Sequence, residues 1–158
     1  MGREVSPTSG IRKLQRLREA EVCARMMTDS EPWRTICQAY DVSLEIVTDP
    51  SRETYLAFIE GEITGFVILH MQGVFHGYIQ AVCVAPEWRN KGIGSQLMAF
   101  AEERIFCETP NAFICVSSFN RDALRLYGRL GYGAMIELRD SEILLRKRML
   151  LTEFKGEG

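Results

Sequence analysis

Apolar side chains recur every three or four residues in several stretches of the chain, a spacing typical of helices that bury one face. This pattern predicts four helices, over residues 16–27, 33–40, 92–108 and 120–130. The clearest is 92–108, whose buried stripe is Ile93, Leu97, Ala101 and Ile105. Residues 28–32 interrupt the first two helices, and residues 41–53 show no clear period.

Other stretches are rich in β-branched and aromatic residues and are bounded by turn residues, which indicates strands. The predicted strands cover residues 10–15, 54–60, 63–72, 78–84, 112–116, 132–138 and 143–150. The resulting order predicts an α+β, three-layer domain with a mixed, mostly antiparallel sheet flanked by helices. We expect a single domain over residues 10–152, with flexible tails at residues 1–9 and 153–158.

Composition places the chain among globular proteins, with 158 residues, 46% hydrophobic and 25% charged. The formal net charge of −2 gives no reason to expect a nucleic-acid partner. No apolar run approaches the roughly 18 residues of a membrane span, and the start of the chain lacks the apolar core of a secretory signal. We therefore expect a cytoplasmic protein with no membrane partner.

The five cysteines are odd in number and irregularly spaced, without a paired metal-binding pattern. Most lie in apolar surroundings, as Cys83 and Cys115 do. The expectation is a set of buried, reduced thiols and no metal site.

A strand, a proline, two cations and two glycines follow one another in Val84-Ala-Pro-Glu-Trp-Arg-Asn-Lys-Gly-Ile-Gly-Ser-Gln-Leu97. The first N–H groups of a helix lack intrahelical partners, and glycine lets a ligand approach the backbone. With Arg89 and Lys91 nearby, this stretch predicts a phosphate or pyrophosphate site. The spacing fits neither a P-loop nor a dinucleotide fingerprint, because Ser95-Gln96 and Leu97 stand where those motifs need other residues. A glycine-rich helix start without a ligand is the alternative.

A second motif, Asn120-Arg-Asp-Ala-Leu-Arg-Leu-Tyr-Gly-Arg-Leu-Gly-Tyr132, stands downstream. Together the two motifs resemble the GNAT superfamily of N-acetyltransferases, over roughly residues 55–150. The resemblance implies acetyl-CoA as donor and an amine as acceptor. It also implies the same three-layer fold and a possible homodimer through the C-terminal strands.

Roles carried over from the resemblance fall on both motifs. Backbone N–H groups of the glycine turn would hold the pyrophosphate, and the backbone of the preceding strand would pair with the pantetheine arm and stabilise the oxyanion. Asn120 would contact the pantetheine arm, and Tyr127 would protonate the leaving thiolate, unless it is only a core aromatic. The implied cofactor-binding set is Val82, Cys83, Val84, Arg89, Asn90, Lys91, Gly92, Ile93, Gly94, Ser95, Asn120 and Tyr127.

The sequence leaves the general base unassigned. Attack needs a neutral amine, and at pH 7 this form costs about 4.6 kcal/mol for a lysine-like amine and about 1.4 kcal/mol for an α-amine. Relatives place a Glu where this chain has Cys115 or Gln80, and neither is a good base. Candidates elsewhere are Glu31, Glu45, His76 and Tyr78, and a water chain held by Gln80 is an equal alternative.

Acceptor specificity in the resembled family comes mainly from the segment between the first two helices, here residues 26–36. Asp29 and Glu31 are suited to attract a cation, and Trp33 to line it. A solvated loop whose Trp packs on the core is the competing interpretation. The leading hypothesis is direct acetyl transfer to a primary amine; the alternatives are a non-catalytic acyl-CoA-sensing module and transfer of a different acyl group.

Overall fold

The computed structural model describes residues 9–138 and 142–149, so the predicted tails lie almost wholly outside the described residues. Ser9 is the exception, and its hydroxyl accepts a hydrogen bond from the Glu60 N–H at 3.2 Å. The elements are β1 Gly10–Lys13, α1 Leu17–Thr28, α2 Tyr40–Thr48, β2 Glu53–Ile59, β3 Glu62–His70, β4 Tyr78–Val84, a 3₁₀ turn Pro86–Trp88, α3 Ile93–Phe106, β5 Asn111–Ser117, α4 Arg121–Arg129, β6 Gly133–Glu137 and β7 Glu142–Arg148.

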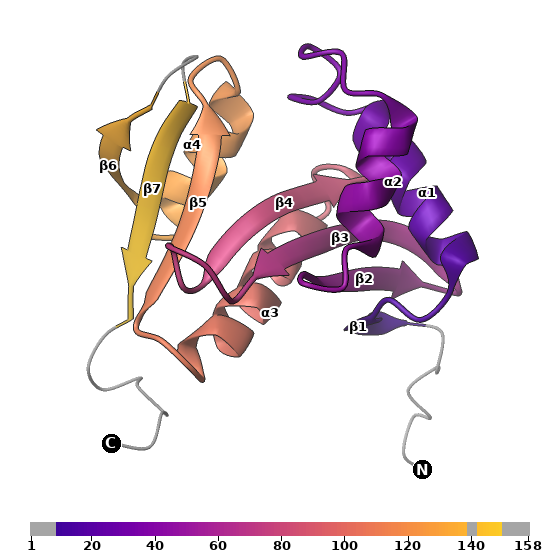
Figure 1. Cartoon of the computed structure of the whole chain (residues 1–158), viewed down its shortest axis with the longest axis horizontal. Helices are drawn as coiled ribbons and strands as arrows, with labels where there is room; N and C mark the ends of the chain where they lie inside the picture. Colours follow the sequence, from indigo (N-terminus) through magenta and orange to yellow (C-terminus); the bar gives the residue numbers. More distant parts are fainter. Residues whose placement is uncertain (1–8, 139–141, 150–158) are drawn as a thin grey trace.

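The strands form one sheet in the order β1-β2-β3-β4-β5-β7-β6. Neighbouring strands are antiparallel except for β4 and β5, which are parallel. Helices α1 and α2 cover one face, and α3 and α4 lie on the other (Figure 1). The predicted three-layer, mostly antiparallel fold is therefore confirmed, and apart from the second helix the predicted bounds agree within two residues.

The uninterrupted apolar run of β3 is explained by helices on both faces of the sheet. Phe66 and Ile68 pack in the cluster beneath α1, while Val67 and Leu69 pack with the apolar stripe of α3. All four side chains are fully buried. Successive strand residues point to opposite faces, so a strand covered on both sides needs apolar residues throughout.

The sheet opens between β4 and β5. Only Tyr78 and Ile79 of β4 pair with β5, opposite Phe113 and Ile114. On the other side of β4, the register with β3 shifts so that Gln80 is an extra residue between Ile79 and Ala81. Such a bulge bends the strand that carries it, which accounts for the divergence of β4 from β5 beyond this point.

The second predicted helix is wrong in position. Residues 33–37 form turns, residues 38–39 are irregular, and α2 begins only at Tyr40. Cys37 has a φ of +56°, a left-handed backbone that cannot continue a right-handed helix. Ile36 is 62% exposed, so the apparent apolar face of this segment is not buried, whereas Val47 of α2 is.

Candidate active site

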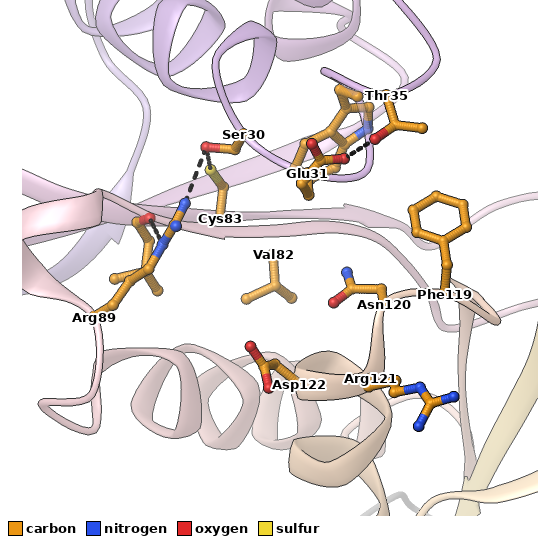
Figure 2. A pocket seen from close by; sticks show the side chains of 12 residues that line it. Ser30, Glu31, Thr35, Val82, Cys83, Arg89, Phe119, Asn120, Arg121 and Asp122 are labelled. Carbon is orange, nitrogen blue, oxygen red and sulfur yellow. Dashed lines mark hydrogen bonds between the residues drawn. The ribbon is translucent and has the colours of Figure 1, made fainter.

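Two adjoining cavities occupy the opening between β4 and β5. The outer cavity, of about 500 Å³, is lined by Val82, Val84 and Arg89 on the β4 side and by the start of α4. The inner chamber, of about 170 Å³, lies between the strands and reaches Tyr127 on α4. Both cavities share Glu31, Trp33, Val82 and Asn120. Figure 2 shows the outer cavity, with Val82 and Asn120 facing the same space.

The backbone of β4 faces this opening at alternate residues. The Ala85 N–H donates to the Thr64 carbonyl of the β3 side at 2.9 Å. Because backbone groups alternate along an antiparallel strand, those of Val82 and Val84 point away from β3. Consistent with this direction, the Val84 carbonyl accepts a hydrogen bond from Arg89 Nε at 3.3 Å. The edge of β4 thus presents backbone donors and acceptors to the outer cavity.

The glycine turn delivers a second set of backbone donors. Asn90 and Gly92 have φ of +60° and +83°, and this left-handed path leads directly into α3. Within the helix start, the Gln96 N–H donates to the Gly92 carbonyl at 3.0 Å. The N–H groups of Ile93, Gly94 and Ser95 come before this first helical hydrogen bond, so they have no partner within the helix. They lie at the positive end of the helix dipole. The Ile93 side chain itself is buried in the core.

Space and charge around this turn fit a pyrophosphate. A Cβ at Gly92 would meet nothing within 4 Å, and one at Gly94 would meet only Leu126 at 3.5 Å and Val84 at 3.8 Å. Arg89 lies across the outer cavity, with one guanidinium nitrogen 3.5 Å from Ser30 Oγ (Figure 2). Lys91 is exposed and lies over the Trp88 ring at 5.2 Å. The hydrogen-bond donors available to a pyrophosphate are therefore mainly backbone N–H groups, with the side chains of Arg89 and Lys91 beside them.

Asn120 and Tyr127 frame the inner chamber from α4, at its first and second turns. Asn120 caps the helix, because its side-chain oxygen accepts from the Ala123 N–H at 3.3 Å. Tyr127 is buried, its ring lies edge-on to Tyr132 with centroids 6.1 Å apart, and burial raises the pKa of its phenol to about 12. A phenol that holds its proton at neutral pH is chemically suited to be an acid rather than a base.

The strand side of the inner chamber is polar. Tyr78 and Cys115 line this side, and burial is the first cause that raises the pKa of both groups. Gln80 Oε1 accepts a hydrogen bond from Arg52 Nε at 2.5 Å, and this bond fixes the orientation of the Gln80 side-chain amide. These contacts place three residues that were considered from sequence in one chamber with Tyr127.

Glu142 is a chamber residue that sequence reasoning missed. It is the first residue of β7, lies opposite Ser117 of β5, and accepts the Ser117 hydroxyl at 2.6 Å. The predicted last strand begins one residue later, at 143, and nothing in the local sequence relates it to Tyr127. Only the pairing of β5 with β7 brings this carboxylate into the chamber.

Two predicted base candidates lie elsewhere. His76 is exposed in the β3–β4 connection, and its Nε2 is 3.2 Å from Glu108 Oε2. It lines a separate cavity beside Arg104 at the far end of α3. Glu45 is exposed on α2 and lines neither the outer cavity nor the inner chamber. His76 therefore lines neither the outer cavity nor the inner chamber, whereas Glu31 and Trp33 line both.

The cysteines only partly match expectation. Cys23 and Cys83 are buried and Cys115 is half-buried, but Cys37 and Cys107 are exposed. Cys37 lies on the turn segment that was expected to be a helix, which explains the error there.

Within residues 9–138 and 142–149, no three His, Cys, Asp or Glu side chains are placed to hold a metal, and no helix is long and apolar enough to cross a membrane.

A mixed sheet that opens between two parallel strands, beside a glycine turn that starts a helix, defines the class of fold. Residues 14–132 match the acetyltransferase (GNAT) family. The chain belongs to this family, as the paired motifs at Arg89–Ser95 and Asn120–Tyr132 predict.

Similar proteins include N-acetyltransferases with different acceptors. A segment of 92 residues is 41% identical to an aminoalkylphosphonate N-acetyltransferase of Salmonella typhimurium, covering 53% of this chain and 58% of that protein. A segment of 84 residues is 36% identical to the N-alpha-acetyltransferase MAK3 of Arabidopsis thaliana, covering 49% and 43%. The matches thus span about half the length of these curated relatives.

A solved structure supports the fold. The PaiA N-acetyltransferase of Thermoplasma acidophilum, crystallised with coenzyme A, superposes with a TM-score of 0.72 over 88% of this chain and 98% of that one. At 17% identity, this likeness concerns the fold alone.

Proposed function

We propose that the protein transfers the acetyl group of acetyl-CoA to a primary amine by direct attack of the amine on the thioester. The observation that carries this proposal is the inner chamber, where Val82 of β4 and Tyr127 of α4 line one space that adjoins the outer cavity. Family membership and the coenzyme A complex of a structural neighbour support acetyl-CoA as the donor.

Binding of the donor is assigned to the backbone. The pyrophosphate would lie against the N–H groups of Ile93, Gly94 and Ser95, with Arg89 and Lys91 adding positive charge beside them. The pantetheine arm would extend along β4 and pair with the backbone of Val82 and Val84, as an added strand does. These groups are fixed by the sheet and by α3, so little ordering is needed on binding.

The chemical step is assigned to groups of the inner chamber. A β4 N–H beside the chamber, that of Val82, would donate to the oxyanion that develops on the thioester carbonyl. Tyr127 would protonate the departing sulfur, and Asn120 would position the pantetheine arm. Glu31 and Trp33 close the chamber from the segment before α2, where the acceptor would approach.

An acceptor screen with isotopically labelled acetyl-CoA tests the proposal. Alkylamines, aminoalkylphosphonates and short peptides would be incubated with the protein, and acetylated products identified by mass spectrometry. Thiol reagents are unsuitable as the readout, because Cys37 and Cys107 are exposed and would react. Labelled amide product supports the proposal; tight binding of acetyl-CoA without any product would favour an acyl-CoA-sensing module instead.

A further inference from the structure

The inner chamber contains five ionisable side chains: Glu31, Tyr78, Cys115, Tyr127 and Glu142. Three of them keep their protons at neutral pH, because burial raises the pKa of both phenols and of the Cys115 thiol. A proton released inside this chamber must therefore go to a carboxylate or to solvent. Glu31 and Glu142 are the two carboxylates that line it.

These two carboxylates differ in how they are held. Glu31 is exposed on the turn segment, and its Oε2 accepts the hydroxyl of Thr35. Glu142 is partly buried on β7 and is fixed by the Ser117 hydroxyl, which uses only Oε1. It lines the same chamber as Tyr78 and Cys115, and its negative charge contributes to the raised pKa of both groups. The positive charge of Arg52 has the opposite effect and lowers the pKa of Tyr78.

We propose that Glu142 is the residue that receives the ammonium group of the acceptor in the inner chamber and takes its proton. This inference rests on the proposed acetyl transfer and deepens it. The carboxylate attracts the cationic form, which predominates for alkylamines at neutral pH, and so brings the amine beside the β4 backbone and Tyr127. A chamber of about 170 Å³ has room for the amino group of an acceptor and the short alkyl segment next to it.

The proton and electron balance of the step is complete with these groups. One N–H bond of the ammonium breaks, and its proton moves to Glu142, directly or through one water. The freed lone pair forms the C–N bond, the C–S bond breaks, and the thiolate takes the Tyr127 proton. The amide nitrogen then returns a proton to Tyr127, and Glu142 releases its proton to solvent, so one amide, one thiol and one proton result.

The test compares the pH dependence of kcat/KM for the wild type and Glu142→Gln, using the best amine found in the acceptor screen. Gln keeps the side-chain size and an oxygen that accepts the Ser117 hydroxyl. For the wild type we expect a plateau that begins well below the pKa of the amine. For Glu142→Gln we expect kcat/KM at pH 7 to fall by roughly 100-fold and to keep rising up to the amine's own pKa.

Two controls separate a catalytic role from a structural one. Glu103→Gln removes an exposed carboxylate of α3 that lines neither the outer cavity nor the inner chamber, and should keep the wild-type profile. Acetyl-CoA affinity, measured by calorimetry, should be the same for Glu142→Gln and the wild type. Unchanged affinity would show that the variant is folded at the cleft.

Each contrary outcome is distinct. A Glu142→Gln enzyme with the wild-type kcat/KM and profile would overturn the inference and leave acetyl transfer intact. A uniform loss at every pH, with the plateau unmoved, would also overturn it, because Glu142 would then be structural. A wild type that acetylates no amine in the screen would overturn the proposed function, and this inference with it.

Discussion

The outer cavity and the inner chamber meet at Val82 and Asn120, but they are built from different parts of the chain. The outer cavity is lined by residues within 30–35, 82–89 and 119–122, but the backbone groups proposed to hold acetyl-CoA, on β4 and at the start of α3, all lie within residues 82–95. The inner chamber presents side chains of β4, β5, α4, β7 and the segment before α2, which lie up to 111 residues apart between Glu31 and Glu142. The backbone groups are therefore local in sequence, whereas the inner chamber exists only after folding.

Because of this difference, we expect the two parts of the site to respond differently to amino-acid substitutions. A backbone site tolerates most side-chain changes and fails when a new side chain fills the ligand's space. A side-chain site fails at single functional groups, even when volume is conserved. The variants below are chosen to separate donor binding in the outer cavity from chemistry in the inner chamber.

The largest effect is expected at Tyr127. Tyr127→Phe removes the hydroxyl and little volume, so kcat should fall by roughly 10- to 10⁴-fold, the usual span for loss of a positioned acid or base. Acetyl-CoA affinity should hardly change. Steady-state kinetics and calorimetry on the same preparation measure both quantities.

Tyr132→Phe is the matched control for that variant. Tyr132 lies edge-on to Tyr127, and its buried hydroxyl has no hydrogen-bond partner among the described residues. Its loss should leave kcat unchanged. An undiminished kcat in Tyr127→Phe would return Tyr127 to a purely structural role.

The next effect concerns Gly94 at the start of α3. The added Cβ of Gly94→Val would make ordinary contacts, so the fold should survive, whereas the methyl groups would occupy the space through which a phosphate approaches. Loss of one hydrogen bond to a charged group predicts roughly 10- to 100-fold weaker acetyl-CoA binding. Gly92→Val is less suitable, because at a φ of +83° it would also strain the backbone.

Arg89→Ala should weaken acetyl-CoA binding less than Gly94→Val, since the cation only supplements the amides. Calorimetry of both variants makes the comparison. A larger loss in Arg89→Ala would mean that side-chain charge, rather than the backbone, dominates the outer cavity.

A smaller effect is expected on stability, away from both cavities. Glu19 accepts Arg12 Nη2 at 2.5 Å and the N–H groups of Gln15 and Arg16 at 3.1 Å each, which ties β1 to the start of α1. Glu19→Gln should lower the free energy of unfolding by up to about 1 kcal/mol at pH 7, because it removes the ion pair with Arg12 while the Gln oxygen can still accept the backbone N–H groups. Glu21→Gln, an exposed change on the same helix, is the control.

The same pair gives a pH test. The hydrogen bond from Arg12 is the first cause that lowers the pKa of Glu19 below its ordinary value of 4.5. A lowered carboxyl pKa means that the stabilisation is complete above pH 4.5 and is lost as pH falls through the folded-state value. Denaturant unfolding should therefore show a wild-type advantage over Glu19→Gln that shrinks in acid; an advantage that grows in acid would contradict the assignment.

The smallest effect is expected at Cys115. Burial raises the pKa of this thiol, so it stays protonated and does not serve as a base in place of a carboxylate. Cys115→Ala should keep kcat/KM within about threefold of the wild type. A loss comparable with that of Tyr127→Phe, measured in the same assay, would show that the thiol takes part in the chemistry.

The sequence predicted the glycine turn and the start of α3 better than the inner chamber for physical reasons. Glycines, cations and the strand-to-helix step at residues 84–97 are contiguous, so their joint geometry follows from local rules. The Ser117–Glu142 contact depends on the register of β5 and β7, which no local pattern specifies. The segment at residues 33–40 has helical apolar spacing but does not form the predicted helix, and its Ile36 side chain is exposed.

Backbone-amide NMR during titration with acetyl-CoA tests the central claim most directly, because the claim concerns amide groups. The account predicts the largest shifts at Val82 and Val84 of β4 and at Ile93, Gly94 and Ser95 of α3, with 1:1 saturation. Shifts centred on other surfaces, such as the groove between α1 and the β2–β3 turn, or no shifts with a folded protein at millimolar acetyl-CoA, would contradict it.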